Sequence, residues 1–196
     1  MPAPGAARLE VLVHRIFPYL PSAPVGEPGH PLYEHHPQRG GRLDHPDYYV
    51  WYLTLQPQAA VGEVFGNLAS WERSMFQAPQ VTGARRALGV YRLPDDLQVL
   101  DLDDPNELAQ RGLRPTQIVV RNLAVTQAWA HHIWNERDPH DPTRRRWQAV
   151  QWWSYHRPFW PVLGSWQRPE LDHVEDLDLD HAAVRDAAEA LTRPLP

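Results

Sequence analysis

The sequence contains no cysteine and no lysine. The absence of Cys excludes disulfide scaffolds, Cys-ligated zinc sites, iron–sulfur clusters and thiol nucleophiles. The absence of Lys excludes Schiff-base chemistry and the phosphate-binding lysine of a P-loop. All 19 basic side chains are therefore Arg. An anion bound by this protein must be held by Arg, by His, by backbone N–H groups or by a helix N-terminus.

The sequence also has no excess of basic residues, because it contains 19 Arg and 24 acidic residues and has a net charge of −5. A nucleic-acid-binding protein normally carries a basic face and a high pI, so direct binding of nucleic acid is not expected. No apolar run approaches the roughly 18 residues of a membrane span. Residues 1–7 lack the charged start and apolar stretch of a signal peptide. We therefore expect a cytoplasmic protein that does not bind a membrane.

A chain of 196 residues is long enough for one domain with a substantial core, and no linker or internal repeat divides it. Apolar periodicity and turn residues predict strands and helices in alternation. The expected strands cover residues 9–17, 49–54, 88–93, 97–101 and 148–155, with an acidic alternating stretch at 171–179. The expected helices start at Pro57 and Pro105 and cover residues 116–137 and 182–192. This order indicates one mixed domain over residues 1–196, with its core at about 10–165.

Residues 18–48 are rich in Pro, Gly and His and show no apolar periodicity. An irregular segment of this length inside a compact domain is uncommon and is usually functional. We therefore expect part of the functional site to lie on this segment.

The histidines first suggest a metal site. They lie in the irregular segment and in the predicted helix 116–137, as His30, His35, His36, His45, His131 and His132. Adjacent residues of a helix point to different faces, so the last two are poorly placed to share one ion. No His-x-x-x-His pair or His-Glu-x-x-His motif occurs. We expect no metal, and a metal-dependent hydrolase that uses the loop histidines stays as an alternative.

A second set of residues combines cationic, acidic and hydroxyl side chains along the chain: Arg15, Arg42, Tyr52, Glu63 and Ser154. Each of them alone has an ordinary structural explanation, such as a solvated helical Glu or a core Tyr in a strand. A Ser-His-Asp hydrolase is poorly supported, because no Gly-x-Ser-x-Gly motif surrounds the Ser.

Taken in order, these residues lie in short motifs that resemble the RES-domain family, which is named for its Arg, Glu and Ser. Residues 52–63 are similar to the family stretch Tyr-Leu-Ala-x-Ser-Pro-x-x-Ala-x-x-Glu. The other similar segments are residues 13–16 (Val-His-Arg-Ile), 40–42 (Gly-Gly-Arg), 95–105, 126–130 and the strand that ends near Ser154. Each motif is short, but all follow in the family's order.

The resemblance implies a fold and a function. RES proteins are bacterial toxins of type II toxin–antitoxin pairs, and their partner is an Xre-type helix-turn-helix antitoxin. Their fold is like that of ADP-ribosyltransferases, and they consume NAD by hydrolysis or phosphorolysis of the nicotinamide–ribose bond. We therefore expect an α+β domain with two small bent sheets and flanking helices around an NAD cleft. Arg42, Tyr52, Glu63 and Ser154 are expected to converge there.

These residue types suit cleavage of an N-glycosidic bond, which passes through an oxocarbenium-like transition state. A buried Glu63 carboxylate would stabilise that cation and accept a hydrogen bond from the ribose. Arg42 and Arg15 would hold the pyrophosphate bidentately. Tyr52 would stack on nicotinamide or ribose, and Ser154 would hydrogen-bond the nicotinamide side. NAD is thus expected as the substrate.

One departure from the family pattern falls beside Arg42, where Leu43-Asp44 stand in place of the usual Trp-Asn. This departure leaves open a RES-like binding protein without catalysis. The resemblance also implies a further alternative, an ADP-ribosyltransferase that acts on a protein, as some family members do. The sequence does not decide whether water, phosphate or a protein accepts the ADP-ribosyl group. It also leaves open a homodimer and the identity of the antitoxin.

Overall fold

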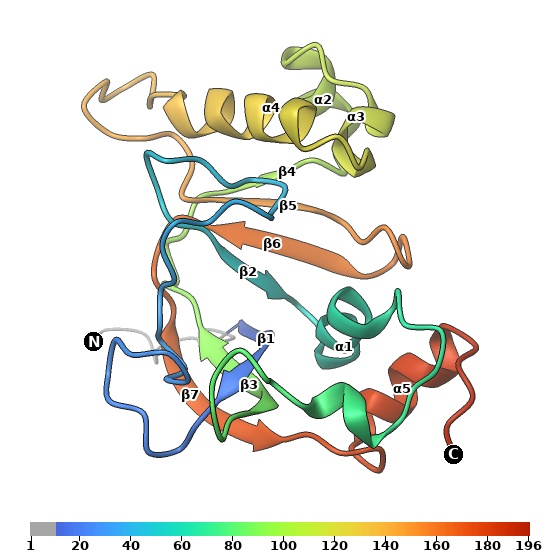
Figure 1. Ribbon diagram of the computed structural model, residues 1–196. Helices are drawn as coiled ribbons and strands as arrows, with labels where there is room; N and C mark the ends of the chain where they lie inside the picture. The colour runs from blue at the N-terminus through green and yellow to red at the C-terminus, as the bar shows by residue number, and fades with distance from the viewer. Residues whose placement is uncertain (1–10) are drawn as a thin grey trace, which may run out of the picture.

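The computed structural model describes residues 11–196, so residues 1–7 and the first two positions of the expected strand 9–17 lie outside the described part. Figure 1 shows the arrangement of its elements. In chain order they are β1 (Leu12–Tyr19), β2 (Trp51–Thr54), α1 (Pro57–Phe65), the 3₁₀ helix η1 (Arg73–Phe76), β3 (Arg85–Arg92), β4 (Val99–Asp101), α2 (Pro105–Gln110), α3 (Pro115–Val119), α4 (Leu123–Asn135), β5 (Ala149–Trp153), β6 (Pro161–Ser165), β7 (Glu170–Asp176) and α5 (Ala182–Ala190).

The strands form a seven-stranded sheet with the order β4-β5-β6-β2-β1-β3-β7. The α+β class is confirmed, but the strands join in one sheet where we expected two. The reason is the junction between β1 and β2, which pair at a single position, His14 with Thr54. On either side of this junction, β2 and β6 pair along Trp51–Thr54, and β1 and β3 pair over the full length of β1. The sheet is therefore two wings that diverge from one shared contact.

Each wing is covered by its own helices (Figure 1). Helices α2, α3 and α4 lie over the wing that contains β4, β5, β6 and β2, whereas α1, η1 and α5 lie beside β1, β3 and β7. The first core contains Ile118, Trp129 and Ile133 from α3 and α4. The second contains Phe65 of α1 and Val184 of α5. β3 and β4 are consecutive in the chain but belong to different wings.

The long helix expected at residues 116–137 is interrupted. It forms α3 and α4, with an extended backbone at Val120 and a new start at Leu123. The side chain of Asn122 accepts a hydrogen bond from the backbone N–H of Ala124 and so caps α4. The apolar spacing continues across the break, which is why periodicity alone predicted a single helix.

Local signals place the other helices well. Pro57 occupies the first position of α1, where its missing N–H costs no hydrogen bond. Asp104 caps α2 by accepting a hydrogen bond from the backbone N–H of Asn106, and Pro105 follows it. The side chain of His181 caps α5 by accepting a hydrogen bond from the backbone N–H of Ala183. None of the helices within residues 11–196 is long and apolar enough to cross a bilayer.

Gly62 fixes how closely α1 approaches the loop between β5 and β6. A Cβ atom at Gly62 would overlap the indole ring of Trp160, which is buried and cannot move aside freely. Gly62→Ala should therefore lower the free energy of unfolding by about 1–2 kcal/mol, because overpacking outweighs the gain in helix propensity. Urea denaturation measures this change. Gly40→Ala is the control, since a Cβ there meets no atom within 4 Å; equal stability of both variants would contradict the packing.

Candidate active site

A cavity of about 430 Å³ lies where the two wings of the sheet diverge. Its wall is built from β1, β2, α1 and the break between α3 and α4. Four of the five residues singled out in the sequence line it: Arg15, Arg42, Tyr52 and Glu63. Its volume lies within the range typical of small-molecule sites. We refer to this cavity as the junction pocket.

Glu63 projects from α1 into the junction pocket, and Ser154 lies directly behind it. The Ser154 hydroxyl donates a hydrogen bond to Oε1 of Glu63 and accepts one from the backbone N–H of His156 at 3.0 Å. Ser154 is buried, whereas Glu63 is exposed. The expectation of a buried Glu63 is therefore corrected, because one turn of α1 faces open space at the pocket. Oε2 of Glu63 accepts no hydrogen bond from residues 11–196 and is free to meet a ligand.

Arg42 also lines the junction pocket. Its Nη1 donates hydrogen bonds to the carbonyl oxygens of Ile118 and Val120, at 2.5 and 2.8 Å. These carbonyls are accessible because the backbone leaves the helical path between α3 and α4. Burial lowers the pKa of Arg42, and the nearby charge of Glu63 opposes that shift. The helix break thus positions a cation in the same pocket as the Glu63 carboxylate, whose charge acts on it.

Tyr52 fixes the loop that carries Arg42. Its hydroxyl donates to Oδ1 of Asp44 at 2.7 Å and accepts from the backbone N–H of Leu43 at 2.8 Å. Asp44 is buried, and its Oδ2 accepts from the backbone N–H of Gly41 at 2.6 Å. Burial and the Asp44 carboxylate raise the pKa of Tyr52, so the hydroxyl stays protonated and can donate. The ring of Tyr52 still lines the pocket.

Tyr52→Phe should lower the free energy of unfolding by about 1–3 kcal/mol, because it leaves the buried Asp44 carboxylate and the Leu43 N–H each short of a partner. Thermal and urea denaturation measure the loss. Tyr155→Phe is a matched control, since Tyr155 is largely exposed. Stability equal to that of the control would show that the hydroxyl does not hold the loop.

The departure from the family pattern has a structural explanation in this chain. Leu43 is completely buried and packs against Gly164 of β6. A Cβ atom at position 164 would overlap the Leu43 side chain. Asp44 supplies both acceptor oxygens for the loop. Both residues therefore serve the interior beneath the pocket, and neither of them lines it.

Arg15 borders the junction pocket, but its charge lies toward another part of the molecule. Its guanidinium carbon sits 5.0 Å from the ring centroid of Trp51, a cation–π contact. Desolvation lowers the pKa of His35, and the positive charge of Arg15 lowers it further. Arg15 is thus shared between the junction pocket and a neighbouring cavity that includes His35.

Three further residues of the pocket were not singled out from the sequence: Arg121, Tyr155 and His14. Arg121 lies in the break between α3 and α4, and its guanidinium carbon is 4.5 Å from the ring centroid of Tyr155. His14 of β1 also lines the pocket, and its buried Nδ1 has no hydrogen-bond partner within residues 11–196. Burial lowers the pKa of His14, which favours the neutral ring. Asn122, a good helix cap, was the available signal for the break that exposes Arg121.

Comparison with known families identifies the chain. The RES domain matches residues 12–186, which is most of the sequence and includes all strands and the start of α5. The chain belongs to the RES-domain family. The residues that suggested this resemblance in the sequence, Arg42, Tyr52 and Glu63, meet at one cavity of this RES domain.

A solved structure has the same fold. It is a chain of the crystal structure of the M. tuberculosis MbcT–MbcA toxin–antitoxin complex, with a TM-score of 0.52 and 19% sequence identity. The match covers 94% of this RES domain protein and 91% of that chain. No curated protein matches the sequence.

Proposed function

We propose that this RES-domain protein is the toxin of a bacterial type II toxin–antitoxin pair and acts by cleaving the nicotinamide–ribose bond of NAD. The observation that carries the proposal is the junction pocket itself. It is lined by a carboxylate, Glu63, held by the buried Ser154, and by the cation of Arg42, close enough for the two charges to interact. This is the arrangement that a dinucleotide with a positively charged nicotinamide ring and an anionic pyrophosphate requires.

In the proposed reaction the bond between C1″ of the ribose and the nicotinamide nitrogen breaks, and its electron pair stays with the ring. Nicotinamide leaves as a neutral molecule, so no strong general acid is needed. Glu63 stabilises the developing oxocarbenium ion with its carboxylate charge. An oxygen of water or of phosphate then forms the new bond to C1″, yielding ADP-ribose or ADP-ribose 1″-phosphate, and the proton of the nucleophile passes to solvent.

Substrate binding in this proposal rests on donors that the fold already orients. Nη1 of Arg42 is occupied by two backbone carbonyls, which leaves the N–H groups on Nε and Nη2 for the pyrophosphate. Arg121 supplies a second guanidinium at the pocket, whereas Arg15 borders the pocket but directs its guanidinium toward Trp51. The rings of Tyr52 and Tyr155 are available for stacking on nicotinamide and adenine.

The proposed partner is an antitoxin of the Xre helix-turn-helix type. The similar fold in a structure of a toxin–antitoxin complex supports this assignment. A segment of the antitoxin that covered the junction pocket would block NAD, and both proteins would act in the cytoplasm. Co-expression with the product of a neighbouring Xre-like gene should restore the growth of cells that express this chain.

The direct test is to incubate the purified protein with NAD, with and without phosphate, and to measure released nicotinamide and the mass of the second product. Release without phosphate indicates hydrolysis, and release that depends on phosphate indicates phosphorolysis. An ADP-ribosyl group found on a protein would indicate transfer. NAD binding without any nicotinamide release would contradict catalysis and favour a binding protein.

A further inference from the structure

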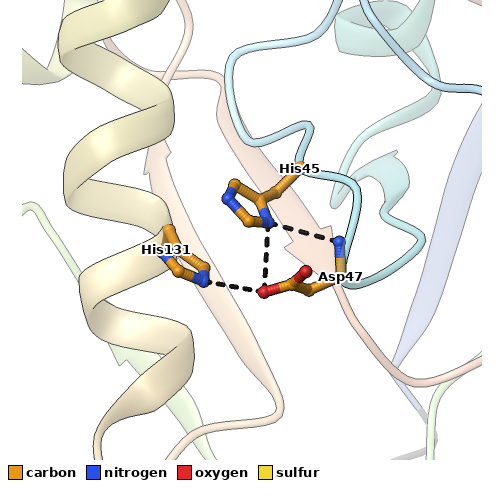
Figure 2. A group of neighbouring side chains, drawn as sticks. All are labelled: His45, Asp47 and His131. Carbon is orange, nitrogen blue, oxygen red and sulfur yellow. Dashed lines mark hydrogen bonds and ion pairs between the residues drawn. The ribbon is translucent and has the colours of Figure 1, made fainter.

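His45, Asp47 and His131 form a compact cluster outside the junction pocket (Figure 2). His45 and Asp47 come from the loop before β2, and His131 comes from the C-terminal half of α4. Oδ2 of Asp47 lies 3.1 Å from Nε2 of His131 and 3.5 Å from Nδ1 of His45. Within residues 11–196, this is the one group of three His or carboxylate side chains whose donor atoms all lie within 4.8 Å of one another.

These separations match the edges of a four-coordinate metal site. With metal–ligand distances of about 2.0–2.1 Å and tetrahedral angles, neighbouring donor atoms are about 3.3 Å apart. The two measured separations from Asp47 bracket this value. Two imidazole nitrogens and one carboxylate oxygen are a donor set that suits late divalent transition ions better than Mg²⁺ or Ca²⁺.

We propose that His45, Asp47 and His131 bind one divalent transition-metal ion of the zinc type, with water at the remaining position. The sequence argued against a metal because His131 and His132 diverge on the helix. In the structure His132 is not part of the cluster, and His131 lies instead beside His45, which is far away in the chain. Sequence spacing could not reveal this pair, because the fold alone brings the loop against α4.

Binding requires small local changes that the exposure of the cluster permits. The two imidazole rings are stacked, with centroids 3.8 Å apart, so each must turn to direct a lone pair at a common ion. His45 Nδ1 must release the backbone N–H of Asp47, and His131 Nε2 must release the Asn135 amide. The side chains of His45, His131 and Asp47 are 28%, 34% and 52% exposed, so they have room to turn and water can satisfy the released donors.

The ion would connect two elements that also build the junction pocket. The loop of His45 and Asp47 begins with the segment that carries Arg42, and α4 begins at the break where Arg42 finds its carbonyl partners. A metal bridge between loop and helix would therefore restrain this loop. The proposal does not depend on NAD chemistry and can be tested without an activity assay.

The test uses the full-length protein with any oligohistidine tag removed and with metal stripped by a chelator. Zn²⁺ is titrated by calorimetry, and the thermal midpoint is measured with Zn²⁺ and with excess chelator. We expect one ion per chain. A free Zn²⁺ concentration about 100-fold above the dissociation constant should raise the midpoint by roughly 5–10 °C.

Three variants locate the site: His45→Ala, Asp47→Asn and His131→Ala. Each should weaken Zn²⁺ binding at least about tenfold, because even the loss of a group that only supports a metal ligand costs about 10–100-fold in affinity. His132→Ala, which changes the exposed neighbour on α4, is the matched control and should bind as the wild type does. The proposal is overturned if the wild type does not bind Zn²⁺, if the three variants bind with unchanged affinity, or if His132→Ala weakens binding equally. The cluster would then be a hydrogen-bonded contact between loop and helix.

Discussion

Glu63→Gln should lower NAD consumption by the purified protein about 1,000-fold and should prevent growth arrest on its expression. The substitution keeps the size of the side chain and an oxygen that can accept the hydrogen bond from Ser154. It removes the negative charge that would stabilise the oxocarbenium ion. Loss of one preorganised electrostatic group typically costs about 100–1,000-fold in turnover, and we expect a loss at the upper end of this range.

The fold should survive this substitution, because Glu63 is exposed and forms no ion pair within residues 11–196. Circular dichroism and the urea midpoint check this point. Glu72→Gln is the matched control, since Glu72 is an exposed carboxylate that does not line the pocket. NAD turnover in Glu63→Gln equal to that of the control would remove Glu63 from the reaction.

Arg42→Ala should have the next largest effect, on both substrate binding and stability. It deletes a half-buried guanidinium that holds the carbonyls of Ile118 and Val120 at the break between α3 and α4. Losing these charge-assisted hydrogen bonds should lower the free energy of unfolding by about 1.5–3 kcal/mol. Losing the contacts to pyrophosphate should raise the KM for NAD by about 100-fold, since each 1.4 kcal/mol is a factor of ten.

Arg42→Lys separates the two effects. A lysine keeps the positive charge and can donate to the carbonyls, but it lacks the planar fork that binds an anion bidentately. Stability should therefore recover more than KM does. Arg39→Ala, an exposed residue of the same irregular segment, should change neither quantity. A KM in Arg42→Ala that equals the wild-type value would show that Arg42 serves only the fold.

Local signals in the sequence predicted the elements but not how they assemble. Pro57 and Asp104-Pro105 mark helix starts by chemistry that acts within one turn, and both were confirmed. The pairing of β1 with β2 at one position depends on contacts between distant segments, so the divergence of the wings could not be read from periodicity. The break before Asn122 was hidden because apolar residues continue at helical spacing on both sides.

The candidate site was predicted only in part, because short motifs identify residues but not where the fold places them. Arg42, Tyr52 and Glu63 were singled out from ordered motifs, and all three line one pocket. Ser154 was expected to contact substrate, but it lies behind the carboxylate, a difference that only burial reveals. Arg121 becomes visible as a pocket residue only once the helix break is known. In a chain without Lys, the guanidinium of Arg is the only permanently charged cation available to such a pocket.

The most direct test of the proposed NAD site is a crystal structure of Glu63→Gln with NAD, since this variant should bind the substrate and consume it only very slowly. We expect NAD in the junction pocket, with the nicotinamide ribose against residue 63 and the pyrophosphate at the guanidinium of Arg42. NAD bound elsewhere on the molecule, or an empty junction pocket at a saturating NAD concentration, would contradict it.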